Sequence, residues 1–241
     1  MSRERNVREA IEYTDFRKTI SERDIETMCA EAVAHGFGAV IVPSAVVSWA
    51  RRSLSQSSSG PRVSIGTVIS YPFGSQSACV KAIEAETALS DGATRLDIVP
   101  HFGTIAAERW ECVRGDLATV RDVAGDAELK LVLEMSCLTP QQIREASAIA
   151  ADLGYTHVSN TVGFRIVSTD PTKSTASGET VTSLQQLVGE TLRVKASGGI
   201  ETKRDVLGLL DAGADRVAVA VAPGRLRVMG WSAEAEGGSG E

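Results

Sequence analysis

The stretch Arg193-Val194-Lys195-Ala196-Ser197-Gly198-Gly199-Ile200 is the part of the sequence from which the fold is best deduced. Its first half places a lysine in a short, largely apolar run, which predicts a buried strand. Its second half breaks into Ser-Gly-Gly, and glycines allow the backbone of a loop to approach a ligand closely. The stretch therefore predicts a strand that delivers the amine of Lys195 to the mouth of a pocket.

The same unit of strand, loop and helix repeats along the chain on both sides of this stretch. Apolar runs predict strands at 10–14, 38–42, 63–69, 95–99, 129–135, 155–159, 192–196 and 216–221. Amphipathic segments predict helices at 21–35, 46–54, 79–89, 106–124, from 140 onward, 181–188 and 203–211. Apolar strands separated by helices indicate a parallel sheet covered by helices. Eight such units favour a closed (β/α)8 TIM barrel over an open sheet.

Length and composition limit the domain organisation and the partners. With 241 residues, 43% of them hydrophobic, one barrel domain at 1–223 is expected, followed by a polar, glycine-rich tail at 224–241 that is predicted to be disordered. The net charge of −6 and the absence of a basic stripe argue against a nucleic-acid partner. The charged start and the lack of a long apolar run argue against secretion and membrane insertion, which leaves a cytoplasmic protein.

Polar residues near the ends of the predicted strands are the candidates for chemistry, because the active sites of such barrels lie at the carboxyl ends of the strands. The candidates are Glu12, Tyr13, Asp15, Asp97, His101, Lys130, Glu134, Ser159, Asn160 and Lys195. An acid such as Asp97 in an apolar strand needs a partner, either Lys195 in a pocket or a purely structural ion pair. Lys130 and Glu134 can be either functional residues or a structural ion pair inside the barrel. His101 can be either a functional residue or a surface residue. The four cysteines are far apart and without metal-type spacing, so no metal site and no cofactor are predicted.

Several segments resemble the deoxyribose-phosphate aldolases, a family of class I aldolases on a TIM barrel. The similar segments are 67–74 (Thr-Val-Ile-Ser-Tyr-Pro-Phe-Gly), 81–86, 95–99 (Arg-Leu-Asp-Ile-Val) and 194–200, the last almost identical to the family's Val-Lys-Ala-Ser-Gly-Gly-Ile motif. The resemblance covers about 10–221. It implies a barrel, an aldolase-like lyase, and a homodimer as a possible assembly.

The chain departs from the family at two functional positions. The family's Schiff-base lysine lies in Val-Lys-Thr-Ser-Thr-Gly-Phe, and the matching residue here is Ser159, whose hydroxyl group forms no imine. The family's phosphate-binding Gly-Thr-Ser-Ser segment is here the hydroxyl-free 218–221 (Ala-Val-Ala-Val). The chain is therefore identified as a divergent member that acts on a carbonyl substrate without phosphate. Arg165 is a possible compensating cation, and 165–180 a possible lid or plain insertion.

Three functions remain open. In the first, Lys195 forms the imine or relays protons in an aldolase reaction, with Asp97 as the proton shuttle and Glu12 orienting Lys195. In the second, a protonated Lys195 polarises the carbonyl in an imine-free aldol-type cyclisation or dehydration. In the third, the barrel only binds a ligand. Substrate contacts are predicted for Ser159, Asn160, His101, Glu134, Gly198 and Gly199.

The charge state of Lys195 is the unresolved point among these functions. The resemblance implies that Lys195 has lost the neighbouring cation, because Ser159 stands where the family has its Schiff-base lysine. Asp97 and Glu12 would then stabilise the ammonium form, and only apolar walls such as Val40, Val42 and Val219 would oppose it.

Overall fold

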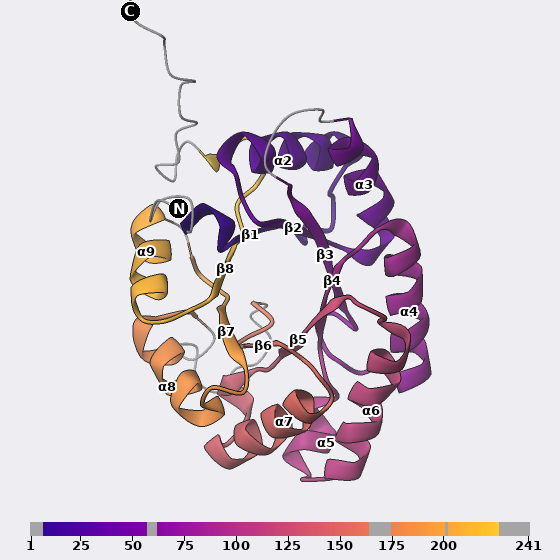
Figure 1. Ribbon diagram of the computed structural model, residues 1–241, viewed down its shortest axis with the longest axis vertical. Helices are drawn as coiled ribbons and strands as arrows, with labels where there is room; N and C mark the ends of the chain where they lie inside the picture. The colour runs from indigo at the N-terminus through magenta and orange to yellow at the C-terminus, as the bar shows by residue number, and fades with distance from the viewer. Residues whose placement is uncertain (1–6, 57–61, 164–174, 201, 227–241) are drawn as a thin grey trace, which may run out of the picture.

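The computed structural model describes residues 7–56, 62–163, 175–200 and 202–226. Eight parallel strands form a closed barrel in the order β1-β2-β3-β4-β5-β6-β7-β8, and helices surround it (Figure 1). The strands are β1 Ile11–Thr14, β2 Ala39–Val42, β3 Ser64–Ile69, β4 Arg95–Ile98, β5 Glu128–Val132, β6 His157–Ser159, β7 Arg193–Ala196 and β8 Arg216–Val219. The predicted TIM barrel is confirmed.

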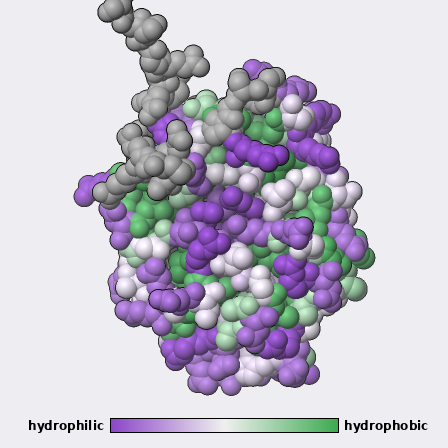
Figure 2. Space-filling model, in the orientation of Figure 1, coloured by the Kyte–Doolittle hydropathy of each residue, from purple (hydrophilic) through white to green (hydrophobic). Residues whose placement is uncertain are grey.

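The helices follow the strands in regular alternation. They are α2 Glu22–His35, α3 Val47–Ser55, α4 Ala78–Asp91, α5 Phe102–Ala106, α6 Trp110–Val123, α7 Pro140–Asp152, α8 Gly178–Val188 and α9 Lys203–Asp211, with short 3-10 turns at Ser44–Val46 and Met135–Cys137. No helix in the described ranges is both long and apolar enough to span a bilayer. Polar side chains predominate over the middle of the face shown in Figure 2, among smaller apolar areas.

The ends of several helices are capped by side chains or by glycine. Ser21 and Asp24 form a capping box at the start of α2, and Gly36 ends that helix with a φ of 68°. Thr139 and Gln142 form a second box at the start of α7, whose first residue is Pro140. These local signals explain why both helices begin where the sequence predicts, and why α2 also ends there.

The predicted helix 106–124 corresponds to α6, but its predicted start is too early. Helix α5 ends at Ala106, and α6 begins at Trp110. Between them Glu108 adopts a φ of 53°, in the left-handed region that ends a right-handed helix. The predicted strand 129–135 also differs: β5 ends at Val132, and a 3-10 turn follows at Met135–Cys137.

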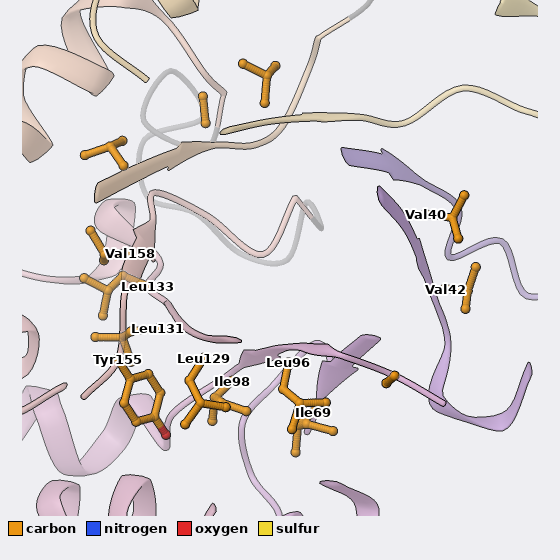
Figure 3. Close-up of a cluster of buried hydrophobic side chains, with 14 of the residues drawn as sticks. Val40, Val42, Ile69, Leu96, Ile98, Leu129, Leu131, Leu133, Tyr155 and Val158 are labelled. Carbon is orange, nitrogen blue, oxygen red and sulfur yellow. The ribbon is translucent and has the colours of Figure 1, made fainter. Parts of the chain in front are cut away.

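Alternation along the strands sorts the side chains into two environments. Residues such as Val40, Leu96, Leu131 and Val158 lie in the layer between strands and helices (Figure 3). Tyr155 belongs to this layer, and its hydroxyl group donates a hydrogen bond to the carbonyl oxygen of Leu117 in α6. The alternate residues point into the barrel, and these include the charged ones discussed below. Residues 227–241 of the predicted tail lie outside the described ranges.

Candidate active site

Four charged side chains from four strands meet inside the barrel. Glu12 comes from β1, Asp97 from β4, Lys130 from β5 and Lys195 from β7. Each occupies an inward position of its strand, and all four are buried. Since unpaired charges are rarely buried, these residues are expected to neutralise one another. We call them the charged cluster.

Each carboxylate of the charged cluster contacts both lysines. The Nζ atom of Lys130 lies 3.0 Å from Oε1 of Glu12 and 3.0 Å from Oδ1 of Asp97. The Nζ atom of Lys195 lies 2.6 Å from Oε2 of Glu12 and also contacts Oδ2 of Asp97. The predicted pairing of Asp97 with Lys195 is therefore present, and Glu12 contacts the same ammonium group.

The charged cluster continues downward into the barrel through further ion pairs. Arg95 donates to Oε1 of Glu12 at 3.1 Å, and Nζ of Lys130 lies 3.3 Å from Oε1 of Glu128. Below them, the buried His157 has its Nε2 atom 2.8 Å from Oδ2 of Asp215. The interior of the barrel is thus a connected network of charges beneath the cavity.

Electrostatics in the charged cluster favour the ionised forms. Burial alone would lower the pKa of Lys195, but the negative charges of Asp97 and Glu12 outweigh it and raise that pKa above its ordinary value. Burial alone would raise the pKa of Glu12, but Lys130, Lys195 and Arg95 hold it well below the usual range. Lys195 is therefore an ammonium ion at neutral pH.

Two features of the surroundings of Lys195 differ from expectation. No lysine from β6 is present, because that position is Ser159, but Lys130 from β5 shares the same two carboxylates. The apolar residues named as its walls, Val40, Val42 and Val219, belong instead to the layer between the strands and the helices. Successive side chains of a strand point to opposite faces, and these three valines are on the face that points away from the interior of the barrel.

Above the charged cluster, the barrel opens into a cavity of about 350 Å³. The floor of the cavity includes Lys195 and Asp97, so two members of the cluster are accessible to a ligand. Of the other residues predicted from the sequence, Asp15, Ser159, Gly198 and Gly199 also line it. The remaining lining residues are Thr14, Phe16, Arg17, Ile41, Val68, Tyr71, Val132, Thr161, Val162, Gly163, Ser197, Ala218, Ala220, Val221 and Ala222.

The ends of β6 and β7 are tied together beside Lys195. The amide side chain of Asn160 accepts a hydrogen bond from the Ser197 backbone N–H at 2.8 Å and donates one to the Ser197 carbonyl oxygen at 3.1 Å. The hydroxyl groups of Ser159 and Ser197 lie 3.0 Å apart. Asn160 itself is buried and does not line the cavity, so it holds the loop rather than facing a ligand.

The loop after β7 requires glycine, as the Ser-Gly-Gly sequence suggested. Gly198 and Gly199 have φ values of 92° and 70°, in the left-handed region. A Cβ atom on Gly199 would also lie only 3.0 Å from the side chain of Thr175. The backbone therefore passes close to the cavity at a point where a larger residue would be strained.

Besides Asn160, two further residues predicted to bind substrate do not line the cavity. Glu134 is buried and accepts hydrogen bonds of 2.6 Å each from Ser136 and from Thr161, a lining residue. His101 is exposed, caps the start of α5 and accepts a hydrogen bond from the backbone N–H of Thr104. Glu134 contacts the lining of the cavity through Thr161, and His101 is not brought to the site.

Sequence reasoning missed the lining residues that come from loops. Phe16, Arg17 and Tyr71 follow β1 and β3 and reach the mouth of the cavity. Only Tyr71 carried a signal, because it lies in the family-like segment 67–74. Among the described residues, no group of histidine, cysteine or acidic side chains has a metal-binding arrangement, and all four cysteines are free thiols.

Comparison with known proteins places this fold and site in one class, the aldolases. A sequence model of the DeoC/LacD aldolase family matches residues 8–232, so the chain belongs to that family and is an aldolase-like lyase. The deoxyribose-phosphate aldolase of Histophilus somni is 34% identical over 212 residues, covering 88% of this chain and 90% of its own length. That of Actinobacillus succinogenes is 36% identical over 213 residues, with 88% and 90% covered.

Solved structures agree with this placement. A putative deoxyribose-phosphate aldolase from Coccidioides immitis superposes with a TM-score of 0.80 at 31% identity, covering 90% of this chain and 83% of its own. The deoxyribose phosphate aldolase from Aeropyrum pernix, described as a unique tetrameric structure, has a TM-score of 0.77 at 25% identity, with 89% and 87% covered.

Proposed function

We propose that this aldolase-like lyase makes or breaks a carbon–carbon bond in a carbonyl substrate that has no phosphate, and that it does so without an imine. The observation that carries the proposal is the position of Lys195, an ammonium group that faces the cavity while Asp97 and Glu12 hold it. An ammonium group in that position polarises a carbonyl group and stabilises an enolate.

In the direction of cleavage, Asp97 acts as the base and Lys195 as the acid. The carboxylate of Asp97 takes the proton of the substrate's β-hydroxyl group, the bond between the α and β carbons breaks, and the electron pair forms an enolate at the neighbouring carbonyl. Lys195 stabilises the enolate and donates a proton to it. Asp97 is then a neutral carboxylic acid and Lys195 a neutral amine. Because the two side chains are in contact, the proton passes from Asp97 to Lys195 and restores the starting charges of the site.

The remaining residues have supporting roles in this mechanism. Glu12 orients the ammonium group of Lys195, and Lys130 balances the charge of both carboxylates. Ser159 and the backbone of Gly198 and Gly199 are in position to hydrogen-bond substrate oxygen atoms. Asn160 and Glu134 act indirectly, by holding Ser197 and Thr161.

The proposal of a substrate without phosphate rests on the side of the cavity built by β8. Its lining residues are Ala218, Ala220, Val221 and Ala222, which offer no hydroxyl group or charge. Arg17 is a cation at the cavity, but Asp15 and Asp24 already pair with it at 2.7 Å and 3.2 Å. The possible compensating residue, Arg165, lies outside the described ranges. Among the described residues, the β8 side therefore offers a phosphate dianion no side-chain donor to replace the water that it would lose there.

A second candidate, an imine on Lys195, is favoured by one observation. Among the described residues that line the cavity, Lys195 is the only lysine. An imine would first require transfer of its proton to Asp97 or Glu12, against the direction in which these carboxylates move its pKa.

Borohydride trapping distinguishes the two mechanisms. The protein would be treated with an aldehyde or ketone and borohydride, and adducts located by intact mass and peptide mapping. Turnover of a carbonyl substrate with no adduct on Lys195 supports the imine-free mechanism, and an adduct on Lys195 supports the second candidate. The variant Ser159→Lys is the positive control, because it restores an amine at the family's position next to a second cation, where an adduct is expected.

Two further outcomes bear on the function itself. Cleavage of deoxyribose phosphate at a rate equal to that of the best phosphate-free substrate would contradict the substrate proposal. Binding of carbonyl compounds without turnover of any would mean that the barrel only binds a ligand. We also propose a cytoplasmic homodimer, as the family resemblance implies, and light scattering on the purified protein tests its mass in solution.

A further inference from the structure

The cavity has an apolar wall above its charged floor. Six lining residues form it: Phe16, Ile41, Val68, Tyr71, Val132 and Val162. All six belong to one hydrophobic cluster inside the barrel, separate from the large cluster between the strands and the helices. The wall is therefore a continuous packed surface rather than a set of scattered apolar groups.

Two aromatic rings form the outer part of this apolar wall. The ring centroids of Phe16 and Tyr71 are 4.7 Å apart, and their planes differ by 23°, so the rings are stacked. Both residues are only partly buried and both line the cavity. A stacked pair that keeps accessible surface beside a cavity offers a flat apolar contact for a further ring or alkyl group.

The β8 side of the cavity is also apolar, with Ala218, Ala220 and Val221. A ligand that reaches from Lys195 toward the mouth therefore passes between two apolar surfaces. A polyhydroxylated tail in this space would leave its water hydrogen bonds unreplaced along both sides. An apolar tail gains free energy there from the surface removed from water.

We propose that the substrate carries an apolar substituent, an aromatic ring or a branched alkyl group, which packs against Phe16 and Tyr71 while its carbonyl group reaches Lys195. This inference rests on the proposed function and names the substrate class of the same site. A cavity of about 350 Å³ is of the size that holds such a small molecule.

Two β-hydroxy ketones test the inference by turnover. One is the phenyl-substituted aldol of benzaldehyde with acetone, and the other is the methyl-substituted aldol of acetaldehyde with acetone. We expect kcat/KM for the phenyl compound to exceed that for the methyl compound by about tenfold or more, as is typical of added apolar contact in a pocket. Phe16→Ala should abolish that preference, because it should lower kcat/KM for the phenyl compound far more than for the methyl compound.

Matched variants exclude a general effect of losing an aromatic ring. Phe73→Ala removes a ring that is 57% exposed and does not line the cavity, so it should change neither substrate. Phe16→Leu keeps the apolar surface but not the flat ring, and should give an intermediate preference. Circular dichroism and thermal unfolding confirm that each variant is folded.

Binding measurements separate this inference from the proposed function. The two ketones that lack the β-hydroxyl group do not react, and calorimetric titration gives their Kd values without any turnover. A Kd at least about tenfold lower for the phenyl ketone, lost in Phe16→Ala, supports the apolar substituent even if no aldol is cleaved. Equal Kd values, or a preference for the methyl compound, would overturn the inference even if aldol cleavage is observed.

Discussion

The floor and the walls of the cavity differ in chemical character. The floor is charged, and Glu12, Asp97, Lys130 and Lys195 bind one another across the barrel. The walls are apolar and come largely from strand ends and loops. A residue of the floor is held by several charged partners, so a change there disturbs the charge balance, whereas a wall residue has no charged partner to lose. The proposed reactive groups and the proposed substrate-recognising groups therefore lie in different parts of the cavity.

The same contrast appears within the family resemblance. Lys195 and Asp97 keep the family's residue types, while Ser159 and 218–221 depart from them. The retained residues lie in the floor. Of the departures, Ala218, Ala220 and Val221 form one wall, and Ser159 lies at the boundary between floor and wall.

The largest expected effect comes from Lys195→Met, which removes the group that faces the substrate. We expect kcat/KM for the best carbonyl substrate to fall by at least about 10³-fold, because acid catalysis and enolate stabilisation are both lost. Steady-state kinetics measure the change. Lys18→Met, at an exposed position outside the cavity, is the matched control. Retention of more than a tenth of the wild-type kcat/KM would show that Lys195 is not the catalytic acid.

Lys130→Met tests whether the charge balance of the floor is structural as well as catalytic. Removing one partner leaves buried carboxylates undercompensated, so the free energy of unfolding should fall by about 3–5 kcal/mol. Denaturant titration measures it. In the helical layer, Lys81 makes a comparable buried pair with Asp116, Nζ to Oδ2 at 2.6 Å. Lys81→Met should destabilise the protein similarly but, unlike Lys130→Met, leave kcat/KM unchanged.

His157 makes the stability of the floor depend on pH. Burial lowers the pKa of His157 below 6.5, although a hydrogen bond with Asp215 and the charge of Glu128 oppose the shift and Lys130 and Arg193 reinforce it. The unfolded chain therefore binds a proton that the folded chain does not. The free energy of unfolding should fall as the pH drops below about 6.5, until the folded-state pKa is reached.

Unfolding of His157→Phe at several pH values tests this expectation. The variant should lose the part of the pH dependence that begins near pH 6.5, while His101→Gln, at an exposed histidine, should keep it. An unchanged pH profile in His157→Phe would mean that another group causes the slope.

The smallest effect is expected in the wall. Ala220→Ser adds a hydroxyl group at an exposed lining position and should change the free energy of unfolding by less than about 0.5 kcal/mol. Thermal and denaturant unfolding measure it. A loss comparable with that of Lys130→Met would contradict the separation between floor and wall.

The fold was predictable from the sequence because each strand and helix carries its own periodic signal. The Lys195–Asp97 pair was predictable for a related reason, since a charged residue in an apolar strand needs a partner. The role of Lys130 was not, because it depends on the register of β4 and β5, which puts Lys130 directly beside Asp97. The direction in which Val40 and Val42 point was not predictable either. Every residue of β2 is apolar, so the sequence does not show which of them face the interior of the barrel and which face the helices.

Loop contributions were the other part that the sequence did not reveal. Phe16 and Tyr71 meet only because the loops after β1 and β3 come together above the barrel. His101 follows a strand end, as a catalytic residue would, but its imidazole group turns to cap α5. The positive φ of Glu108 was also not predictable, because glutamate is not a residue type that favours the left-handed region.

The two hydrogen bonds between the Asn160 side chain and the Ser197 backbone have a consequence for amide hydrogen exchange. Loop amides usually exchange quickly with solvent, through local openings that cost little free energy. The Ser197 amide is 2.8 Å from the Asn160 side chain in a residue that is only 8% exposed, so its exchange requires β6 and β7 to separate. It should exchange as slowly as the amides of the strands, and Asn160→Ala should bring it to the rate of an ordinary loop. The rim of the cavity next to Lys195 is in this sense part of the rigid barrel.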